Sequence, residues 1–307
     1  MQRAYLSKLL ELAENNADVL HLVADSGTGF DEMFKHSFPG QMINFGIAEE
    51  HMVAASAGLA TAGKIPFVYT AGAFLAYRSL EFIRNDICFQ NLNVKIVGMG
   101  SGLAWCSLGP THHTTEDIAV LRAIPNLMIL SPATPVQVSQ CVELAYRHTG
   151  PVYIRIGMNN EKEFFAGSHD LPASGQNVLR GGGNIVILST GNILENVLSA
   201  ADELEKDNLL ASVINIVRIK PFDKTALFQE IMSADYVVTV EEHNICGGLG
   251  SIAAEALASS GIGKKLIRIG LNDIFAEGYG NSQEIVRAQN GLDAAAIAET
   301  IRRRLRE

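Results

Sequence analysis

The segment Gly46-Ile-Ala-Glu-Glu-His51 carries an acidic side chain where it could take part in acid–base chemistry. An apolar stretch at 42–45 precedes it and is typical of a strand, and an Ala- and Gly-rich run at 54–60 follows it and is typical of a helix. Because a helix of such small residues packs closely against another backbone, we expect Glu49 at its start to be partly dehydrated and able to hold or donate a proton. The alternative is an ordinary first-turn acid that the helix dipole favours.

Three further segments follow in a fixed order along the chain: Ala73-Phe-Leu-Ala-Tyr-Arg78, Gly109-Pro-Thr-His-His113, and Glu241-Glu-His-Asn244 with Gly247-Gly-Leu-Gly-Ser251 behind it. Each segment alone is a weak signal. The series of four resembles the transketolase family, including deoxyxylulose-phosphate synthase, over nearly the whole chain. This resemblance implies a thiamine diphosphate enzyme that transfers a two-carbon ketol unit between sugars.

The resemblance also implies a cofactor site. Glu49 matches the acid that bonds the aminopyrimidine ring and promotes the imino form, which deprotonates the thiazolium carbon. Phe74 matches a ring that stacks on the aminopyrimidine, a contact that contributes roughly 1 kcal/mol beyond burial, and Tyr77 matches a second aromatic of the same pocket. Without the flanking motif, both rings would be read as core packing.

Two more residues belong to this expected cofactor site. Arg78 matches a group that bonds the cofactor or a partner, although it could equally pair with Glu81 one turn on. Asp25 ends the strand expected at 19–24 and matches an acid at the cofactor and the subunit interface. Its alternative role is to cap the next turn.

The loop that contains the two histidines is expected to bind substrate. By resemblance, His112 bonds the substrate carbonyl oxygen and relays protons, which suits an imidazole near neutral pH. His113 stands where the family usually has Gln, and Trp105 lies beside the site. Adjacent histidines seldom bind one ion and no third ligand is evident, so we expect no metal on this chain.

Phosphate binding is assigned to two arginines by the same resemblance. Arg155 matches the residue that holds the terminal phosphate of the substrate, and a guanidinium suits a pair of phosphate oxygens. Arg3 matches another phosphate-side arginine less securely and could instead be a solvent-exposed charge.

The loop departs from the family pattern at two positions. Leu108 replaces an Asp that recognises the hydroxyl next to the reacting carbonyl, and Gly100 replaces a His near the substrate phosphate. Losing a buried group that bonds a hydroxyl changes which sugar is accepted. We therefore expect a non-standard sugar as the substrate.

A full transketolase also has a domain with a Gly-Asp-Gly motif and a later Asn, which bind Mg²⁺ and the cofactor diphosphate. This chain contains no Gly-Asp-Gly. The resemblance therefore implies the C-terminal half of a split enzyme. Its partner would be an N-terminal subunit that holds Mg²⁺, in an assembly of two of each chain.

Short apolar strands alternate with helical stretches, which predicts an α/β fold with two domains, each a mostly parallel sheet with helices on both faces. We expect a pyrimidine-binding domain at 1–160, a linker at 161–183 and a transketolase C-terminal domain at 184–307. Catalytic groups should then lie in loops at the carboxyl ends of the strands.

Composition indicates which partners to exclude. The formal net charge is −9, which argues against nucleic-acid binding, and no apolar run reaches the length of a membrane span. The N-terminus lacks the apolar core of a signal peptide, and the four cysteines have neither metal nor redox spacing. We expect a cytoplasmic protein.

Two other functions remain open from the sequence. The chain could be the beta subunit of a 2-oxoacid dehydrogenase, which has the same two-domain plan, or a non-catalytic scaffold. The Gly-Pro-Thr-His-His segment fits a transketolase better, and the joint presence of Glu49, Phe74 and His112 argues against a scaffold.

Overall fold

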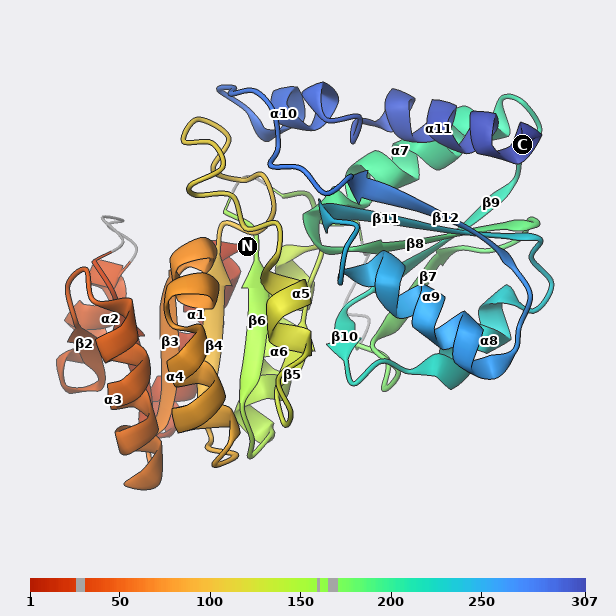
Figure 1. The fold of residues 1–307 in the computed structure, drawn as a ribbon. Helices are drawn as coiled ribbons and strands as arrows, with labels where there is room; N and C mark the ends of the chain where they lie inside the picture. The colour runs from red at the N-terminus through yellow and green to blue at the C-terminus, as the bar shows by residue number, and fades with distance from the viewer. Residues whose placement is uncertain (26–30, 159–160, 165–170) are drawn as a thin grey trace. The chain divides into compact units, whose positions relative to one another are not determined.

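The computed structural model describes residues 1–25, 31–158, 161–164 and 171–307. It contains two compact units (Figure 1). The first unit comprises 1–101 and 120–170, and the second comprises 102–119 and 171–307. Part of the predicted linker, 165–170, lies outside the described residues.

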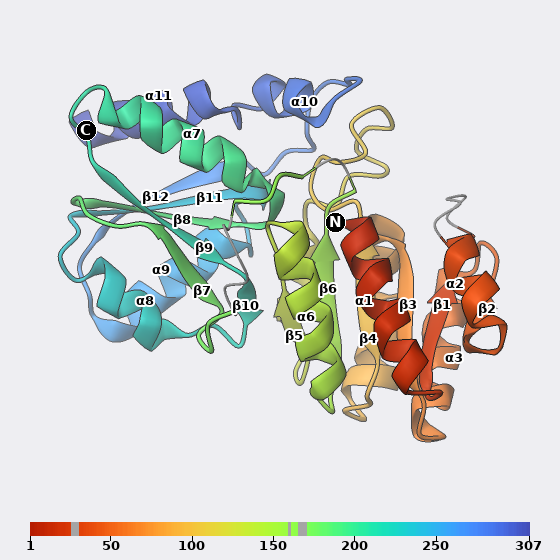
Figure 2. The same cartoon turned by 180° about the vertical axis from the view of Figure 1, so that it is seen from behind.

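The first unit is a parallel α/β layer structure. Its strands are β1 (Val19–Val23), β2 (Met42–Asn44), β3 (Ile65–Ala71), β4 (Lys95–Met99), β5 (Met128–Leu130) and β6 (Val152–Ile156), and they lie side by side in the order β5-β6-β4-β3-β1-β2. Its helices include α1 (Gln2–Asn15), α2 (Asp31–Ser37), α3 (Glu49–Thr61), α4 (Leu80–Phe82) and α6 (Pro135–Arg147). Helices α1 and α6 cover one face of the sheet, and α3 and α4 cover the other (Figures 1 and 2).

The second unit repeats this plan with a smaller sheet. Its strands are β7 (Gln176–Arg180), β8 (Ile185–Thr190), β9 (Ala211–Ile216), β10 (Arg218–Lys220), β11 (Tyr236–Asn244) and β12 (Lys265–Leu271), of which five form a sheet in the order β12-β11-β8-β9-β7. Its helices are α7 (Leu194–Glu205), α8 (Lys224–Ile231), α9 (Leu249–Ser260), α10 (Gln283–Gln289) and α11 (Ala294–Arg306). The short helix α5 (Asp117–Arg122) lies across the boundary between the two units.

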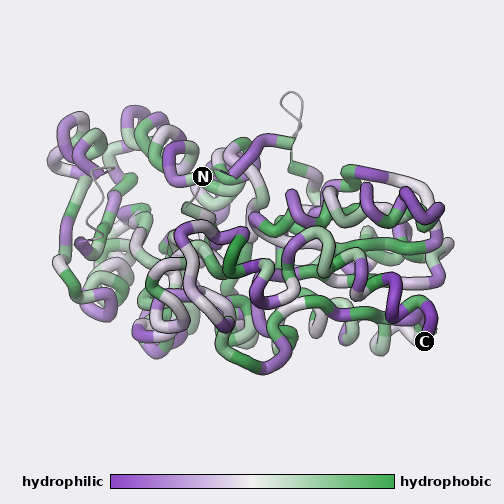
Figure 3. The backbone as a smooth tube through the Cα atoms, turned by 90° about the horizontal axis from the view of Figure 1, so that it is seen from above, coloured by the Kyte–Doolittle hydropathy of each residue, from purple (hydrophilic) through white to green (hydrophobic). Residues whose placement is uncertain are grey.

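Burial of the strands explains the layers. Every residue of β1, β4 and β6 is buried, as expected of parallel strands that are covered by helices on both faces. In Figure 3 the strands are largely green, whereas the helices alternate between green and purple. The predicted fold class, two mostly parallel sheets with helices, is confirmed. No helix among the described residues combines the length and the apolar character that crossing a membrane requires.

Two local features differ from the sequence expectations. Strand β7 lies within the residues assigned to the linker, and it pairs antiparallel with β9. The helix expected near Phe74 is a π-helical turn, Phe74–Arg78, which is followed by α4 and by a second π-helical segment, Ile83–Cys88. Helical periodicity in a sequence does not distinguish these helix types, because they differ only in which backbone groups bond.

Lys95 is a buried cation at the start of β4, with 0% of its surface exposed. Its Nζ donates hydrogen bonds to the carbonyl oxygens of His148, at 2.6 Å, and Gly150, at 2.8 Å. Lys95 therefore holds the turn between α6 and β6. Burial lowers the pKa of Lys95 to about 7, since the charged form loses its water. Burial, and then the charge of Lys95, also lower the pKa of His148.

We expect Lys95→Met to change how stability depends on pH. The pKa of a lysine in an unfolded chain is roughly 10.4, so between about pH 7 and 10 the unfolded protein binds a proton that the folded protein lacks. Over that range the free energy of unfolding of the wild type should rise with pH relative to Lys95→Met. The slope should approach about 1.4 kcal/mol per pH unit.

Urea denaturation of both proteins across that pH range measures the difference. The matched control is Lys206→Met, because Lys206 is exposed and should contribute no such slope. Parallel pH profiles for the wild type and Lys95→Met would show that Lys95 stays charged in the fold and that the prediction is wrong.

Candidate active site

Glu49 is a buried carboxylate at the first position of α3, with 3% of its surface exposed. Arg78 Nη1 donates a hydrogen bond to Glu49 Oε2 at 2.6 Å. A carboxylate loses much solvation on burial, and a charge-assisted hydrogen bond from a guanidinium offsets part of that cost. The arginine is 42% exposed at its side chain, so the pair extends from the interior to the surface.

The turn before α3 brings Glu49 to the edge of the sheet. Strand β2 ends at Asn44, whose Oδ1 accepts hydrogen bonds from the backbone N–H of Gly46 at 2.8 Å and of Asp25 at 3.4 Å. The carboxyl ends of β1 and β2 are therefore joined through one side chain. This contact sets the direction in which the chain enters α3.

The π-helical turn supplies the aromatic residues beside Glu49. Arg78 Cζ lies 5.0 Å from the centroid of the Phe74 ring, within the range of a cation–π contact. Phe74 and Tyr77 are both half-buried. Of the two expected roles for Arg78, the structure shows an ion pair, but with Glu49, while Glu81 is exposed. The turn therefore brings Phe74, Arg78 and Glu49 together, and π-helical turns are frequent at functional sites.

The other candidates of the first unit lie apart from this group. Asp25 is exposed after β1, with φ +22°, and residues 26–30 beyond it lie outside the described part of the chain. Arg155 is 1% exposed and lies on β6, where it pairs in register with Gly98. Arg3 is exposed on α1.

In the second unit, the loop with the histidines is closed by a short backbone bridge. Gly102 and Thr114 exchange two hydrogen bonds, of 3.0 and 2.9 Å. Within the loop, the Trp105 and His112 rings lie 6.0 Å apart at an interplanar angle of 57°. The Thr111 hydroxyl lies 2.9 Å from His112 Nδ1. The structure thus brings Trp105 and His112 together.

His113 follows this pair in the loop and is 2% exposed. Burial lowers the pKa of His113, Glu242 opposes that change, and His112 adds to it, so the ring is neutral at pH 7. Neither ring nitrogen of His113, nor the buried Nε1 of Trp105, has a hydrogen-bond partner among the described residues. Unsatisfied buried polar atoms are costly and uncommon, so these three atoms indicate a place where a ligand or water binds.

A buried ion-pair network that the sequence reading missed supports the loop. Glu242 accepts hydrogen bonds from Arg287 Nε at 3.0 Å and from Gln283 Nε2 at 2.9 and 2.8 Å. Burial disfavours the charged form of Arg287, but the ion pairs with Glu242 and Glu284 outweigh it and raise its pKa. A Cβ at Gly102 would overlap the Glu242 carboxylate, so the loop runs directly against this network.

The glycine-rich segment after β11 is filled by the protein itself. Glu241 accepts hydrogen bonds from the N–H groups of Leu249, at 2.6 Å, and Gly250, at 2.8 Å, and so caps α9. A Cβ at Gly248 would overlap the same carboxylate. The segment therefore serves tight packing, as the sequence reading favoured, and its helix N-terminus already holds an anion.

His243 links the same strand to α5. Its Nδ1 lies 2.6 Å from the carbonyl oxygen of Asn244, and its Nε2 accepts a hydrogen bond from the N–H of Ala119 at 3.3 Å. These contacts assign the neutral tautomer with its proton on Nδ1. Among the described residues, no group of three or more His, Cys, Asp or Glu could hold a metal ion.

Comparison with known proteins identifies the two parts of the chain. The transketolase pyrimidine binding domain matches residues 1–162, and the transketolase C-terminal domain matches residues 175–297.

Individual relatives are similar along nearly their whole length. One of the two subunits of an apulose-4-phosphate transketolase from Actinobacillus succinogenes is 35% identical, over 96% of this chain and 94% of its own. A 6-deoxy-6-sulfo-D-fructose transketolase subunit of a Clostridium species is 33% identical, over 94% of this chain and 92% of its own. A solved structure described as a split gene transketolase, inactive beta4 tetramer, has a TM-score of 0.89 and 34% identity, over 98% of this chain and 97% of its own.

These similarities extend through both units and include the segments that carry Glu49 and His112. The chain therefore belongs to the transketolase family, whose members are thiamine-diphosphate-dependent transferases.

Proposed function

We propose that this chain is the subunit of a split transketolase that supplies the pyrimidine-binding and C-terminal domains. It transfers a two-carbon ketol unit between sugars together with a partner chain. The observation that carries this proposal is the buried Glu49 carboxylate, paired with Arg78 beside the Phe74 ring. Relatives named as transketolase subunits disfavour both a 2-oxoacid dehydrogenase subunit and a scaffold.

The residues of the first unit fit the pyrimidine end of thiamine diphosphate. A carboxylate that can hold a proton suits a ring nitrogen, and an aromatic face suits the aminopyrimidine plane. When bound, the cofactor supplies a nucleophilic carbon. In this proposal Glu49 holds the activating proton, Phe74 and Tyr77 enclose the ring, and Arg78 and Asp25 complete the contacts.

The residues proposed to bind substrate have complementary chemistry. His112 bonds the reacting carbonyl oxygen and moves protons, and His113, which is neutral at pH 7, offers both a donor and an acceptor. Trp105 provides an indole N–H and a ring face. Arg155 and Arg3 bind the phosphate. The burial of Arg155 supports this role, since an ion pair is stronger away from water.

The proposed partner is an N-terminal subunit that holds Mg²⁺ and the cofactor diphosphate, in an assembly of two of each chain. The similar solved structure, an inactive tetramer of beta chains, supports the need for a second kind of subunit. We propose domains at 1–160 and 184–307 joined by a linker. We also propose a cytoplasmic location, which suits the four free cysteines.

This chain alone should bind thiamine diphosphate poorly and should not transfer ketol units. Adding the chain with the Gly-Asp-Gly motif should restore both properties, because that chain supplies the Mg²⁺ and diphosphate contacts. Isothermal titration and a coupled ketol-transfer assay measure the two properties. Efficient transfer by the purified single chain with cofactor and Mg²⁺ would overturn the split-enzyme proposal.

Glu49→Gln should nearly abolish turnover in the reconstituted enzyme and leave the fold intact. The amide keeps the shape of the side chain but cannot hold the acidic proton. The measurement is hydrogen–deuterium exchange at the thiazolium carbon of bound cofactor. Glu50→Gln, which removes the same charge one residue further along the helix, is the control and should exchange as the wild type does. Normal exchange in Glu49→Gln would remove Glu49 from this role.

The preferred substrate should differ from the standard pentose phosphates. Leu108 and Gly100 leave a sugar hydroxyl and a phosphate without their usual partners, and an unpaired hydroxyl costs roughly 1–3 kcal/mol. Relatives named for apulose 4-phosphate and for 6-deoxy-6-sulfo-D-fructose support this expectation.

The test compares kcat/KM of the reconstituted enzyme for xylulose 5-phosphate with that for modified or deoxy sugars. We expect at least one modified sugar to be used better. If the pentose phosphates react with ordinary efficiency and no other sugar is better, the substrate proposal fails and the reaction type stands.

A further inference from the structure

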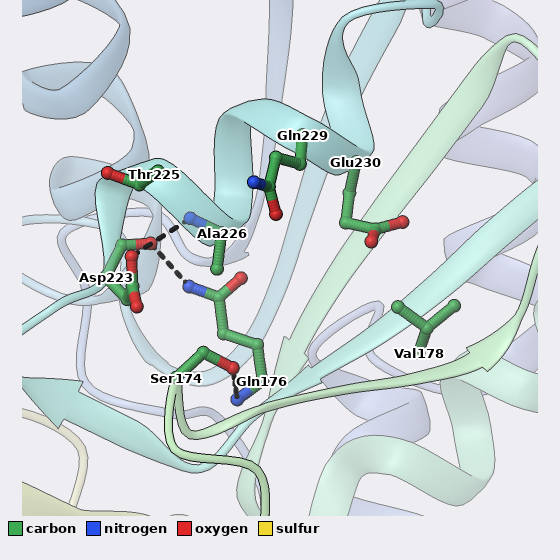
Figure 4. A pocket seen from close by; sticks show the side chains of 8 residues that line it. All are labelled: Ser174, Gln176, Val178, Asp223, Thr225, Ala226, Gln229 and Glu230. Carbon is green, nitrogen blue, oxygen red and sulfur yellow. Dashed lines mark hydrogen bonds between the residues drawn. The ribbon is translucent and has the colours of Figure 1, made fainter.

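The second unit contains a cavity of about 380 Å³ between β7 and the start of α8 (Figure 4). This volume lies in the range of small-molecule sites and is too large for a single bare ion. The described residues that line it are polar or small: Ser174, Gln176, Val178, Asp223, Thr225, Ala226, Gln229 and Glu230. The proposed transketolase reaction assigns no role to any of them.

The lining of the cavity favours a cation. Two of its residues, Asp223 and Glu230, carry carboxylates, and none of the described lining residues carries a positive charge. Two cations lie nearby in the sequence, but neither is a lining residue. Lys224 is exposed, and Arg218 Nε donates to the carbonyl oxygen of Pro221 at 3.2 Å.

The amino end of α8 does not offer an anion site in this cavity. Asp223 is the N-cap residue, and its Oδ1 accepts a hydrogen bond from the N–H of Ala226 at 2.9 Å. The positive end of the helix is therefore already matched by a carboxylate of the chain itself.

Gln176 gives the independent sign that a ligand binds. It is 6% exposed, and its Nε2 donates to the carbonyl oxygen of Asp223 at 2.7 Å. Its Oε1, on the opposite side of the amide, is buried and has no hydrogen-bond partner among the described residues (Figure 4). A buried acceptor without a donor is costly, so this position in the cavity suits an N–H group.

The spacing of the two carboxylates indicates the form of the ligand. Asp223 caps α8 and Glu230 lies seven residues further along the chain, a rise of about 10 Å on a helix. One ammonium group does not serve both carboxylates at this separation. We propose that the cavity binds a short linear aliphatic diamine, with its ammonium groups at Asp223 and Glu230 and an N–H directed to Gln176 Oε1.

Isothermal titration of the full-length chain with butane-1,4-diamine tests this proposal. Butane-1,4-diol is the uncharged probe of equal length, and butylamine carries a single charge. We expect the diamine to bind at a one-to-one ratio, butylamine to bind more weakly, and the diol to give no heat. Binding should weaken as salt is added, because the carboxylates are near the surface.

Variants locate the site. Glu230→Gln removes one exposed carboxylate and should weaken diamine binding at least tenfold, whereas Glu299→Gln, an equal charge change on α11 of the same unit, should leave it unchanged. Gln176→Met should also weaken binding, and it is compared only at an unchanged melting temperature. Equal binding of diamine and diol, no binding of the diamine, or wild-type affinity in Glu230→Gln would each overturn the proposal.

Discussion

Buried carboxylates impose the strongest local constraint in both units. A charge removed from water requires a partner at close range, and breaking a buried ion pair costs about 3–5 kcal/mol. Glu49 satisfies this requirement through Arg78, and Glu242 through Arg287 and Gln283. In each unit the pair ties a helix or loop to a segment distant in sequence. The geometry of the candidate site therefore follows from how its charges are neutralised.

Parallel sheets add the second constraint, since their strands all end at one edge. In the first unit, β1, β2 and β3 lead into Asp25, the Glu49 turn and the π-helical turn. Asn44 bonds the backbone at the ends of both β1 and β2, which makes this edge one connected structure. In the second unit, β11 ends in Glu241, Glu242 and His243, which in turn hold α9, the loop with His112, and α5.

Much of the fold could be predicted because the patterns are local. The strands at 19–23, 65–71 and 128–130 are apolar runs bounded by polar residues, and the helix with Leu6, Leu9 and Ala13 follows one face. The misses have physical reasons. Strand β7 has the burial of an edge strand and a mixed composition, so it resembles a linker. The π-helical turn arises from packing that no local residue pattern specifies.

The sequence by itself determined which residue types stand at each strand end: an acid that begins a helix, an aromatic and an arginine four residues apart, and two adjacent histidines. Only the tertiary structure decided how deeply each is buried and which partner it has. Arg78 could pair with Glu81 on local spacing, yet it pairs with Glu49, since that carboxylate is the buried one. Likewise, the unpartnered nitrogens of His113 and the network around Glu242 depend on segments more than a hundred residues apart, because burial is a property of the packed chain and not of any local stretch.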